Sequence, residues 1–427
     1  MLVRSKRAVA AYLKEDRCEM SLIRKYRRDL LVFVLFCLLV IVTARSVLDK
    51  MDRVILGYDT DTRLNLWTDW WTAKAVSESE TSLWYTDYLF YPEGTTLAFH
   101  SFSHLNSLVS ISLAQLVGTI PAYNITILLN FVLIGLATFQ LAHYETGSTG
   151  ASLLAALVLT FNSQSQYQAA HPVLLSIWVL PWVTLAFLRA VRQHSFGWAI
   201  VASLVILLTS LVSILLLILV GFWLAVLVIY LLLSSGLRQL PWRIIFTVAL
   251  LGPALSLPIL YPLLTEMVAN ANISFINPAS EVYSTDLLFF VLPQWYRWAN
   301  RGIYVGVVPA WLFLVVLGRR RRQTALWLFL LAVAFLLAVG PEPSFGGIEL
   351  GITFPWSWAI ATLLRHPYRF NILIAFALAM IAAYGWLAVS TGIKQRRRQL
   401  LLLLVLSAGI FAEYTILAFP YTRLIAS

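Results

Sequence analysis

The sequence predicts an all-α membrane protein that crosses the bilayer with about eleven transmembrane helices. Of its 427 residues, 60% are apolar and 12% are charged, whereas soluble domains have about 45–50% apolar and about 25% charged residues. The mean hydropathy is +0.80. The apolar residues form long unbroken runs, and Lys and Arg gather between these runs. This pattern excludes a soluble enzyme, a disordered or fibrous protein and a membrane β-barrel.

The chain opens with a basic segment, residues 1–29, that carries nine Lys and Arg residues. Because positive charge next to a span favours the cytoplasmic side, this segment is predicted to be cytoplasmic and to precede a transmembrane domain over residues 30–427. The net charge of +11 comes from residues that flank apolar runs, which indicates contact with anionic lipids and no nucleic-acid partner. Cys18 and Cys37 offer neither a disulfide framework nor metal-ligand spacing.

The apolar runs are assigned to spans in order. The first span is expected at residues 30–48, and a long polar loop follows at 49–104. The next run, residues 105–118, is short and interrupted by Ser and Gln, so an interfacial or re-entrant helix is predicted there. The other spans are expected at 121–143, 150–164, 172–190, 196–214, 216–235, 242–263, 304–318, 323–340, 368–389 and 399–418.

This assignment fixes the predicted topology. If the run at 105–118 does not cross, every dense basic cluster, including Arg319–Arg322, falls on the cytoplasmic side. The N-terminus is then cytoplasmic and the C-terminus extracytoplasmic, in the plasma or inner membrane. The long loops at 49–104, 266–304 and 341–367 all lie outside, whereas the inner turns are short. Because the sequence also lacks a glycine-rich nucleotide-binding motif, a polar substrate is expected to react at the outer face.

The first outer loop carries the strongest candidate for chemistry. Asp59 and Asp61 lie two residues apart, in a loop that holds nine of the chain's 20 acidic residues. Such a pair can deprotonate an acceptor hydroxyl or hold a divalent cation beside a phosphate. Trp67, Trp70 and Trp71 follow at helical spacing, which predicts a helix in the membrane interface. Solvated acids and simple aromatic anchors are the alternative interpretation.

Trp67 and Trp71 of this helix are candidates for substrate binding, and several other outer residues are candidates as well. Glu93 lies in an aromatic stretch, and His171 ends the second outer turn. His100 and His104 are spaced i, i+4, so on one helical face they would hold a metal or a phosphate. Histidines satisfied within the interface are the alternative. Glu413 falls inside the last span, where a carboxylate is costly and indicates either function or a polar partner.

Two arginines precede and enter a late span. Arg365 and Arg369 are expected near the outer interface, and a guanidinium group pairs with phosphate through two parallel hydrogen bonds. The alternative is that both side chains extend from the span to the lipid head groups.

Taken together, these motifs resemble those of the polytopic GT-C glycosyltransferases, especially their prokaryotic members. The resemblance covers about residues 50–420 and rests on an acidic motif, a Trp-x-x-Trp-Trp helix, a Tyr-Pro-x-Gly stretch, a Leu-Asn helix, an Arg-x-Pro-x-Arg-Phe stretch and an acidic last span. In this sequence the corresponding residues are Asp59/Asp61, Trp67/Trp70/Trp71, Tyr91–Gly94, Leu105-Asn106, Arg365–Phe370 and Glu413-Tyr414.

The resemblance implies a GT-C-like fold and a transferase activity. GT-C enzymes move a sugar from a polyprenyl-phosphate or polyprenyl-diphosphate carrier to a protein, lipid or glycan acceptor on the outer face. By analogy Asp61, with Asp59 as the second choice, would take the acceptor proton. A divalent cation, Mg²⁺ or Mn²⁺, assists some members. The additional Asp that relatives often carry in the second outer turn is missing here, and this leaves a metal cofactor open.

Two other interpretations remain at this stage. A transporter or flippase for a lipid-linked or polar substrate would carry ionisable residues in several spans, whereas the spans here are nearly free of charge. A catalytically inactive scaffold that binds lipid carriers is not excluded. Many GT-C members also continue into an outer soluble domain, whereas only about nine residues follow the last expected span here. A minimal form, a fragment and an inactive member are all compatible with that ending.

Overall fold

The structure is a computed structural model that describes most of the chain. The described residues are 26–57, 60–100, 102–269, 284–292, 303–319, 323–354, 366–415 and 421–423. Asp59 and Arg365, two of the predicted site residues, lie outside these ranges.

Each segment that was expected to span the membrane contains a helix. The long helices are residues 26–43, α5 (Thr119–Thr146), α6 (Thr149–Phe161), α9 (Val179–Gln193), α10 (Phe196–Val212), α11 (Ile214–Ser235), α12 (Trp242–Ala269), α13 (Val307–Arg319), α14 (Ala325–Ala338), α16 (Asn371–Ser390) and α17 (Arg396–Thr415). Six helical segments among the described residues are long and apolar enough to cross a membrane, and four further apolar helices are shorter. The chain is therefore a multi-pass, all-α membrane protein, as predicted.

Short elements connect these helices. The helical ones are α2 (Arg45–Leu48), α3 (Thr60–Ser77), α4 (His104–Val117), α7 (Ser163–Tyr167), η1 (Gln168–Ala170), α8 (Pro172–Leu175), η2 (Leu237–Gln239), η3 (Leu287–Phe290) and η4 (Pro367–Phe370). The strands form three antiparallel pairs: β1 (Val54–Leu56) with β6 (Tyr421–Arg423), β2 (Tyr85–Thr86) with β3 (Thr95–Thr96), and β4 (Ser344–Phe345) with β5 (Ile348–Glu349).

The core is built around α16. Every residue from Asn371 to Trp386 is buried, which a helix achieves when apolar side chains cover all its faces and neighbours surround it. Trp223 of α11, Trp327 of α14 and Phe376 of α16 pack ring against ring at centroid distances between 5.4 and 6.0 Å. Because such large aromatic groups bury much apolar surface, this cluster fixes how α11, α14 and α16 meet.

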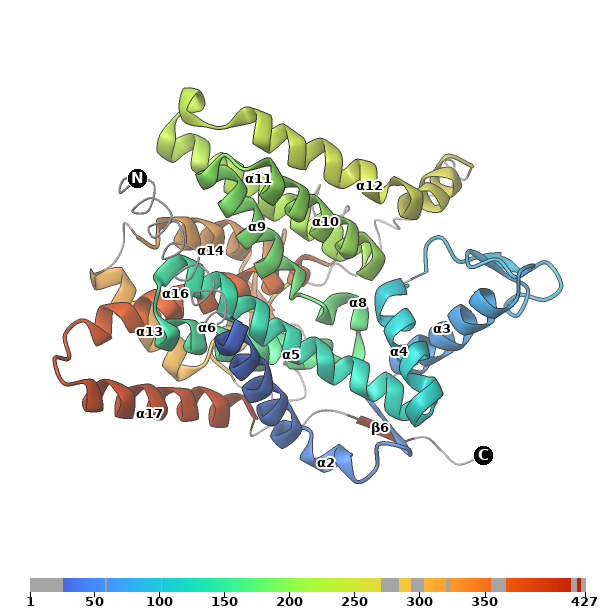
Figure 1. The fold of residues 1–427 in the computed structure, drawn as a ribbon, viewed down its shortest axis with the longest axis horizontal. Helices are drawn as coiled ribbons and strands as arrows, with labels where there is room; N and C mark the ends of the chain where they lie inside the picture. Colours follow the sequence, from blue (N-terminus) through green and yellow to red (C-terminus); the bar gives the residue numbers. More distant parts are fainter. Residues whose placement is uncertain are drawn as a thin grey trace, which may run out of the picture.

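The first loop and the end of the chain lie together. In Figure 1, α3, α4 and β6 occupy the same end of the molecule, and the connection between α16 and α17 lies at the other end. Strand β1 pairs with β6 in the register Val54↔Arg423. A segment that follows the first span and one that follows the last span lie on the same side of the membrane only if the total number of spans is odd. The pairing of β1 with β6 therefore agrees with the predicted odd number of spans.

Asn124 of α5 holds β1 in place. Its side-chain oxygen accepts a hydrogen bond from the backbone N–H of Leu56 at 2.8 Å. Its amide nitrogen donates to the carbonyl groups of Val54 and Met51 at 2.8 and 3.0 Å. Asn124 is fully buried, and these bonds satisfy backbone groups that would otherwise lack partners. The start of the first loop is thus fixed to the transmembrane core.

Asp286 joins the other two outer loops. Its carboxylate accepts hydrogen bonds from the backbone N–H groups of Leu288, Gly346 and Gly347 at 2.7–2.9 Å, and from the Ser344 hydroxyl at 3.2 Å. It therefore begins η3 and at the same time holds the β4–β5 hairpin. This acidic residue has a structural role, which its place in a loop did not reveal.

Candidate functional site

The candidate site lies where the first loop meets the turn before α9. Nε2 of His171 lies 3.0 Å from Oδ2 of Asp61. Asp61 is in the first turn of α3, and His171 begins α8. The Asp61 side chain is 57% exposed and that of His171 is 23% exposed. The structure thus brings together two predicted residues that are 110 positions apart in the sequence, with the carboxylate open to solvent.

Two further contacts fix α3 against this turn. The side-chain amide of Asn65 donates to the carbonyl of Ala170 at 3.0 Å. Gly57, which precedes α3, has a φ of +110°, and a Cβ atom there would lie 2.7 Å from Thr62 Oγ1 and 2.8 Å from the Ala170 Cα atom. Both the backbone angle and the close approach require glycine. Gly57 therefore sets how near Asp61 comes to His171.

The substitution Gly57→Ala is expected to lower both stability and transfer activity. The added methyl group must displace backbone at Ala170, and the unfavourable φ alone costs about 1–2 kcal/mol. Gly147 is the matched control, because it also has a positive φ, +65°, but nothing lies within 4 Å of its Cβ position. Thermal unfolding midpoints in detergent of Gly57→Ala and Gly147→Ala separate the two effects. Equal losses in the two variants would show that the close approach does not matter.

The three tryptophans of α3 form one aromatic cluster, as predicted. The rings of Trp67 and Trp71 are parallel with centroids 5.9 Å apart, and Trp70 lies 6.3 and 6.1 Å from them. The Tyr88 ring meets Trp70 and Trp71 edge-on. Trp71 is only 2% exposed, whereas Trp70 is 43% exposed. Trp71 therefore supports the stack from inside, and Trp70 presents an open aromatic face.

His100 and His104 do not share a helical face. Helix α4 begins at His104, so His100 lies in the loop before it, and the expectation of a common face is wrong. Both rings instead contact Phe102 at 5.1 Å, His100 edge-on and His104 stacked. His100 Nε2 is 3.3 Å from the Thr68 hydroxyl, and the His104 ring meets Trp84 edge-on at 4.9 Å. Burial lowers the pKa of His100, and it lowers the pKa of His104 to about 4.

The pKa of His104 predicts a loss of stability in acid. The folded protein keeps His104 neutral down to about pH 4, whereas the unfolded chain protonates it near the ordinary value of about 6.5. Stability is therefore complete above pH 6.5 and falls towards pH 4, by up to about 3 kcal/mol. The variant His104→Phe keeps the aromatic contacts and should flatten this dependence. Unfolding free energies of both proteins at several pH values test this. Identical pH dependence would contradict the prediction.

Asp69 is a buried carboxylate that the sequence analysis missed. It is 6% exposed, accepts a hydrogen bond from the Ser107 hydroxyl of α4 at 2.6 Å, and has a pKa that burial raises. It borders a cavity of about 20 Å³, enough for one water molecule. A usable signal was present, because Thr62, Asn65, Asp69 and Thr72 recur at helical spacing. That pattern gives α3 a polar face, and the structure turns it inward.

A buried polar network continues from α4 into the core. Asn106 of α4 donates to the Ser103 and Ser176 hydroxyls at 2.8 and 3.0 Å. Asn130 of α5 donates to the Asn106 carbonyl oxygen at 3.0 Å, and its own carbonyl oxygen accepts from Ser176 and from Trp178 Nε1 at 2.7 and 2.8 Å. The network ties α4 and α5 to the residues between His171 and α9. The platform beneath the candidate site is therefore held by hydrogen bonds as well as by apolar packing.

The other predicted residues lie elsewhere in the fold. Arg369 is on η4, beside α14 and at the start of α16. Glu93 is exposed at the tip of the β2–β3 hairpin, where its carbonyl accepts a hydrogen bond from the Tyr85 hydroxyl. Glu413 of α17 accepts hydrogen bonds from the Tyr304 hydroxyl and the Val307 backbone N–H at 2.6 and 2.8 Å. Glu413 therefore has the polar partners that its place in a span requires.

The side chains at this site that could coordinate a cation are those of Asp61 and His171. Within the described residues, no group of three or more His, Cys, Asp or Glu side chains is placed to hold a metal ion. A carboxylate and an imidazole together suit Mn²⁺ better than Mg²⁺, which prefers oxygen ligands alone.

Comparisons with known proteins identify the fold. No family model and no curated protein matches the sequence. The structure is similar to the archaeal oligosaccharyltransferase AglB from Archaeoglobus fulgidus, in complex with an inhibitory peptide and a dolichol-phosphate. The TM-score is 0.51 and the identity 14%, over 92% of this chain and 56% of that one. ArnT from Cupriavidus metallidurans in the apo state gives a TM-score of 0.48 and 16% identity, over 88% of this chain and 61% of that one.

This chain thus spans less than two thirds of the length of either neighbour. The similarity to AglB establishes the fold: the chain has the GT-C-like membrane fold that its motifs predicted.

Proposed function

We propose that this protein is a membrane glycosyltransferase that moves a sugar from a polyprenyl-phosphate-linked donor to an acceptor hydroxyl at the extracytoplasmic face. The proposal rests above all on the contact between Asp61 and His171 at 3.0 Å, with an exposed carboxylate. An accessible carboxylate held by an imidazole is suited to receive a proton from a hydroxyl group. Asp61 lies on α3 of the first loop and His171 at the start of α8, and α3 lies at the same end of the molecule as β6 (Figure 1).

The proposed reaction is a single displacement. The acceptor oxygen attacks the anomeric carbon of the sugar while Asp61 takes the hydroxyl proton. The bond between the anomeric carbon and the phosphate oxygen breaks, and its electron pair leaves with the polyprenyl phosphate. Attack from the face opposite the leaving group inverts the anomeric configuration. His171 acts as a positioning residue, because its ring nitrogen lies within hydrogen-bond distance of the carboxylate and limits the directions it can take.

The leaving phosphate needs a positive partner as its charge develops. Arg369 is proposed for this role together with Arg365, since both belong to the segment that enters α16. The exposed ring of Trp70 offers an aromatic face against which a sugar ring can pack. The dolichol-phosphate in the AglB complex supports a donor with a lipid phosphate. The proposed acceptor is a glycan, a lipid or a protein.

A divalent cation would be held by Asp61 and His171 and would neutralise phosphate charge when bound. Chelation with EDTA, followed by addition of Mn²⁺ or Mg²⁺, tests this part of the proposal. Transfer that Mn²⁺ restores would support it, and transfer that EDTA leaves unchanged would remove it.

The proposed function is tested with the full chain in lipid nanodiscs. The protein is incubated with a panel of polyprenyl-phosphate sugars and with membrane extract as the acceptor source, and free polyprenyl phosphate is measured by mass spectrometry. We expect the wild type and Arg53→Gln to release polyprenyl phosphate. We expect Arg369→Gln to release it at a rate that is lower by about 10²-fold or more. Arg53 is an exposed cation of the first loop and serves as the control for a general loss of positive charge. Movement of intact donor between leaflets without release of polyprenyl phosphate would instead identify a flippase.

A further inference from the structure

A second cavity lies far from the candidate site. It has a volume of about 830 Å³ and is bordered by the start of helix 26–43, the last turns of α5, one side of α9 and the first turns of α10. His143 on its wall and Asn124 beside β1 lie nineteen positions apart on α5, which corresponds to about 28 Å at 1.5 Å per residue. This separation is close to the thickness of a bilayer core, about 30 Å. The cavity therefore belongs to the opposite membrane face from the first loop.

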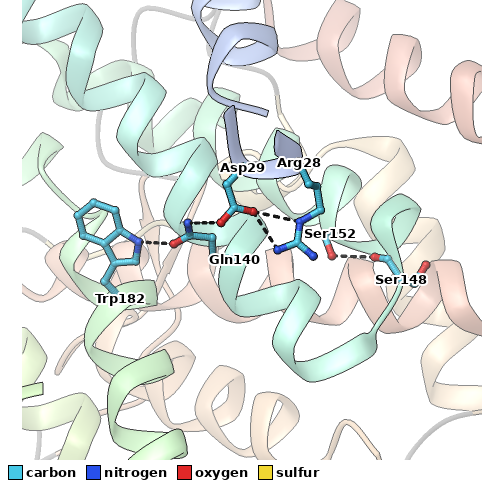
Figure 2. A network of polar contacts seen from close by, with 6 residues as sticks. All are labelled: Arg28, Asp29, Gln140, Ser148, Ser152 and Trp182. Atoms are coloured by element: carbon cyan, nitrogen blue, oxygen red, sulfur yellow. Dashed lines mark hydrogen bonds and ion pairs between the residues drawn. The ribbon is translucent and has the colours of Figure 1, made fainter. Parts of the chain in front are cut away.

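A chain of hydrogen bonds forms one wall of this cavity (Figure 2). Arg28 pairs with Asp29 Oδ1 at 2.9 Å. The other oxygen of Asp29 accepts from Gln140 at 3.0 Å, and the Gln140 carbonyl oxygen accepts from Trp182 Nε1 at 3.0 Å. The negative charge of Asp29 is thus already engaged by a cation and an amide.

Arg189 supplies a positive charge that Asp29 attracts, although the two form no direct ion pair in the described part of the chain. Its guanidinium group lies over the rings of Trp198 and Tyr144, at 4.4 and 5.0 Å from their centroids. Among the described residues Arg189 forms no ion pair, because the nearby Glu145 pairs with Arg192 at 2.6 Å. Aromatic contacts engage the face of a guanidinium and leave its N–H edge available for a planar anion.

His143 also lies on this wall. Its Nδ1 atom is buried and has no hydrogen-bond partner within the described part of the chain. Its ring is held parallel to Phe139 at 5.8 Å, so its orientation is fixed. The charged residues that line the cavity are Arg28, Arg189 and Asp29, and their net charge is +1.

The rest of the cavity is apolar. Leu185, Ala186, Val201 and Val205 line it, and Val201 is 40% exposed on the outer surface of α10. A cationic wall therefore continues into an apolar channel that opens between helices. That combination matches a molecule with an anionic head and a hydrocarbon tail rather than a free anion.

We propose that this cavity binds an anionic membrane phospholipid, with its phosphate at Arg189 and Arg28 and the start of an acyl chain along Val201 and Val205. The phosphate would meet the N–H edge of Arg189, which its aromatic contacts leave available. The site lies on the face opposite the proposed transferase site and does not depend on that activity.

The test measures lipid binding to the full chain. Delipidated protein in a neutral detergent is titrated with phosphatidylglycerol or phosphatidylcholine of identical acyl chains, and bound lipid is counted by native mass spectrometry. Phosphatidylglycerol should bind more tightly to the wild type. The substitution Arg189→Gln should weaken it about five-fold and leave phosphatidylcholine unchanged. Arg243→Gln, which removes an exposed cation at the start of α12, should have no effect.

A second variant keeps the test independent of Arg189. The substitution Val201→Trp fills the apolar channel without changing charge, and it should also weaken phosphatidylglycerol. Equal binding of the two lipids by the wild type would overturn the proposal. A second pair of results would also overturn it: Val201→Trp binds the lipid as well as the wild type does, and inorganic phosphate competes with the lipid. That result would identify a site for free phosphate. Thermal unfolding midpoints confirm that the variants are folded.

Discussion

Replacing Asp61 by asparagine is expected to lower the turnover of sugar transfer by about 10²–10⁴-fold, the usual contribution of a positioned general base. Asparagine has the same size and can still contact His171, so the geometry of α3 should survive. What it loses is the ability to accept a proton at the moment of attack. Without a divalent cation, binding of the lipid donor should be nearly unchanged, because its phosphate is proposed to be held by Arg365 and Arg369. The measurement is kcat and KM for the donor identified in nanodiscs.

Two further variants sharpen this result. Asp87→Asn removes an exposed carboxylate from the same loop and should leave kcat unchanged, which controls for the charge of the loop. His171→Gln should reduce kcat by about 10-fold, since it loosens Asp61 without removing the base. If Asp61→Asn and Asp87→Asn behave alike, Asp61 is not the base, and Asp59 becomes the residue to test.

Replacing Asn130 by alanine is expected to cause the largest loss of stability, about 2–5 kcal/mol. Asn130 is 2% exposed and its amide bridges α4, α5 and the residues after α8. Truncation leaves Trp178 Nε1 and the Ser176 hydroxyl buried without that acceptor. Each orphaned group costs about 1–3 kcal/mol.

Thr138→Val in the same helix is the matched control. Thr138 is also fully buried, but its hydroxyl donates only to the carbonyl one turn back, at 2.7 Å from Ile134 O. Its loss should change stability by less than about 0.5 kcal/mol. Equilibrium unfolding in mixed micelles gives both values. Similar losses of unfolding free energy in the two variants would show that the bridging hydrogen bonds of Asn130 contribute no more to stability than the local hydrogen bond of Thr138.

The helices could be predicted from the sequence because their cause is local. Uninterrupted apolar runs of about 20 residues have few alternatives in a bilayer, and the interrupted run at residues 105–118 also forms a helix, α4. The aromatic cluster of α3 was predictable for the same reason, since Trp67, Trp70 and Trp71 recur at helical spacing.

The partnerships between distant residues could not be predicted in this way. Asp61 and His171 were each identified, but nothing in the local sequence says that they touch. Asp69 was overlooked because it stands among tryptophans that suggested a purely interfacial helix, whereas its burial depends on Ser107 of α4. Glu413 was ambiguous until its partner Tyr304 was known. In each case the deciding contact joins segments whose approach depends on the packing of the whole bundle.

The pairing of β1 with β6 has a consequence for biogenesis. It joins residue 54 to residue 423, so the two strands are separated by nearly the whole transmembrane bundle, and contacts of such long range form late. Strand β1 leads through Gly57 directly into the helix that carries Asp61. During membrane insertion the first loop emerges early but receives its strand partner only after the last helix has been integrated. The proposed enzyme would therefore acquire the β1–β6 pairing beside its site only after synthesis of α17, which delays transfer until α17 is in place.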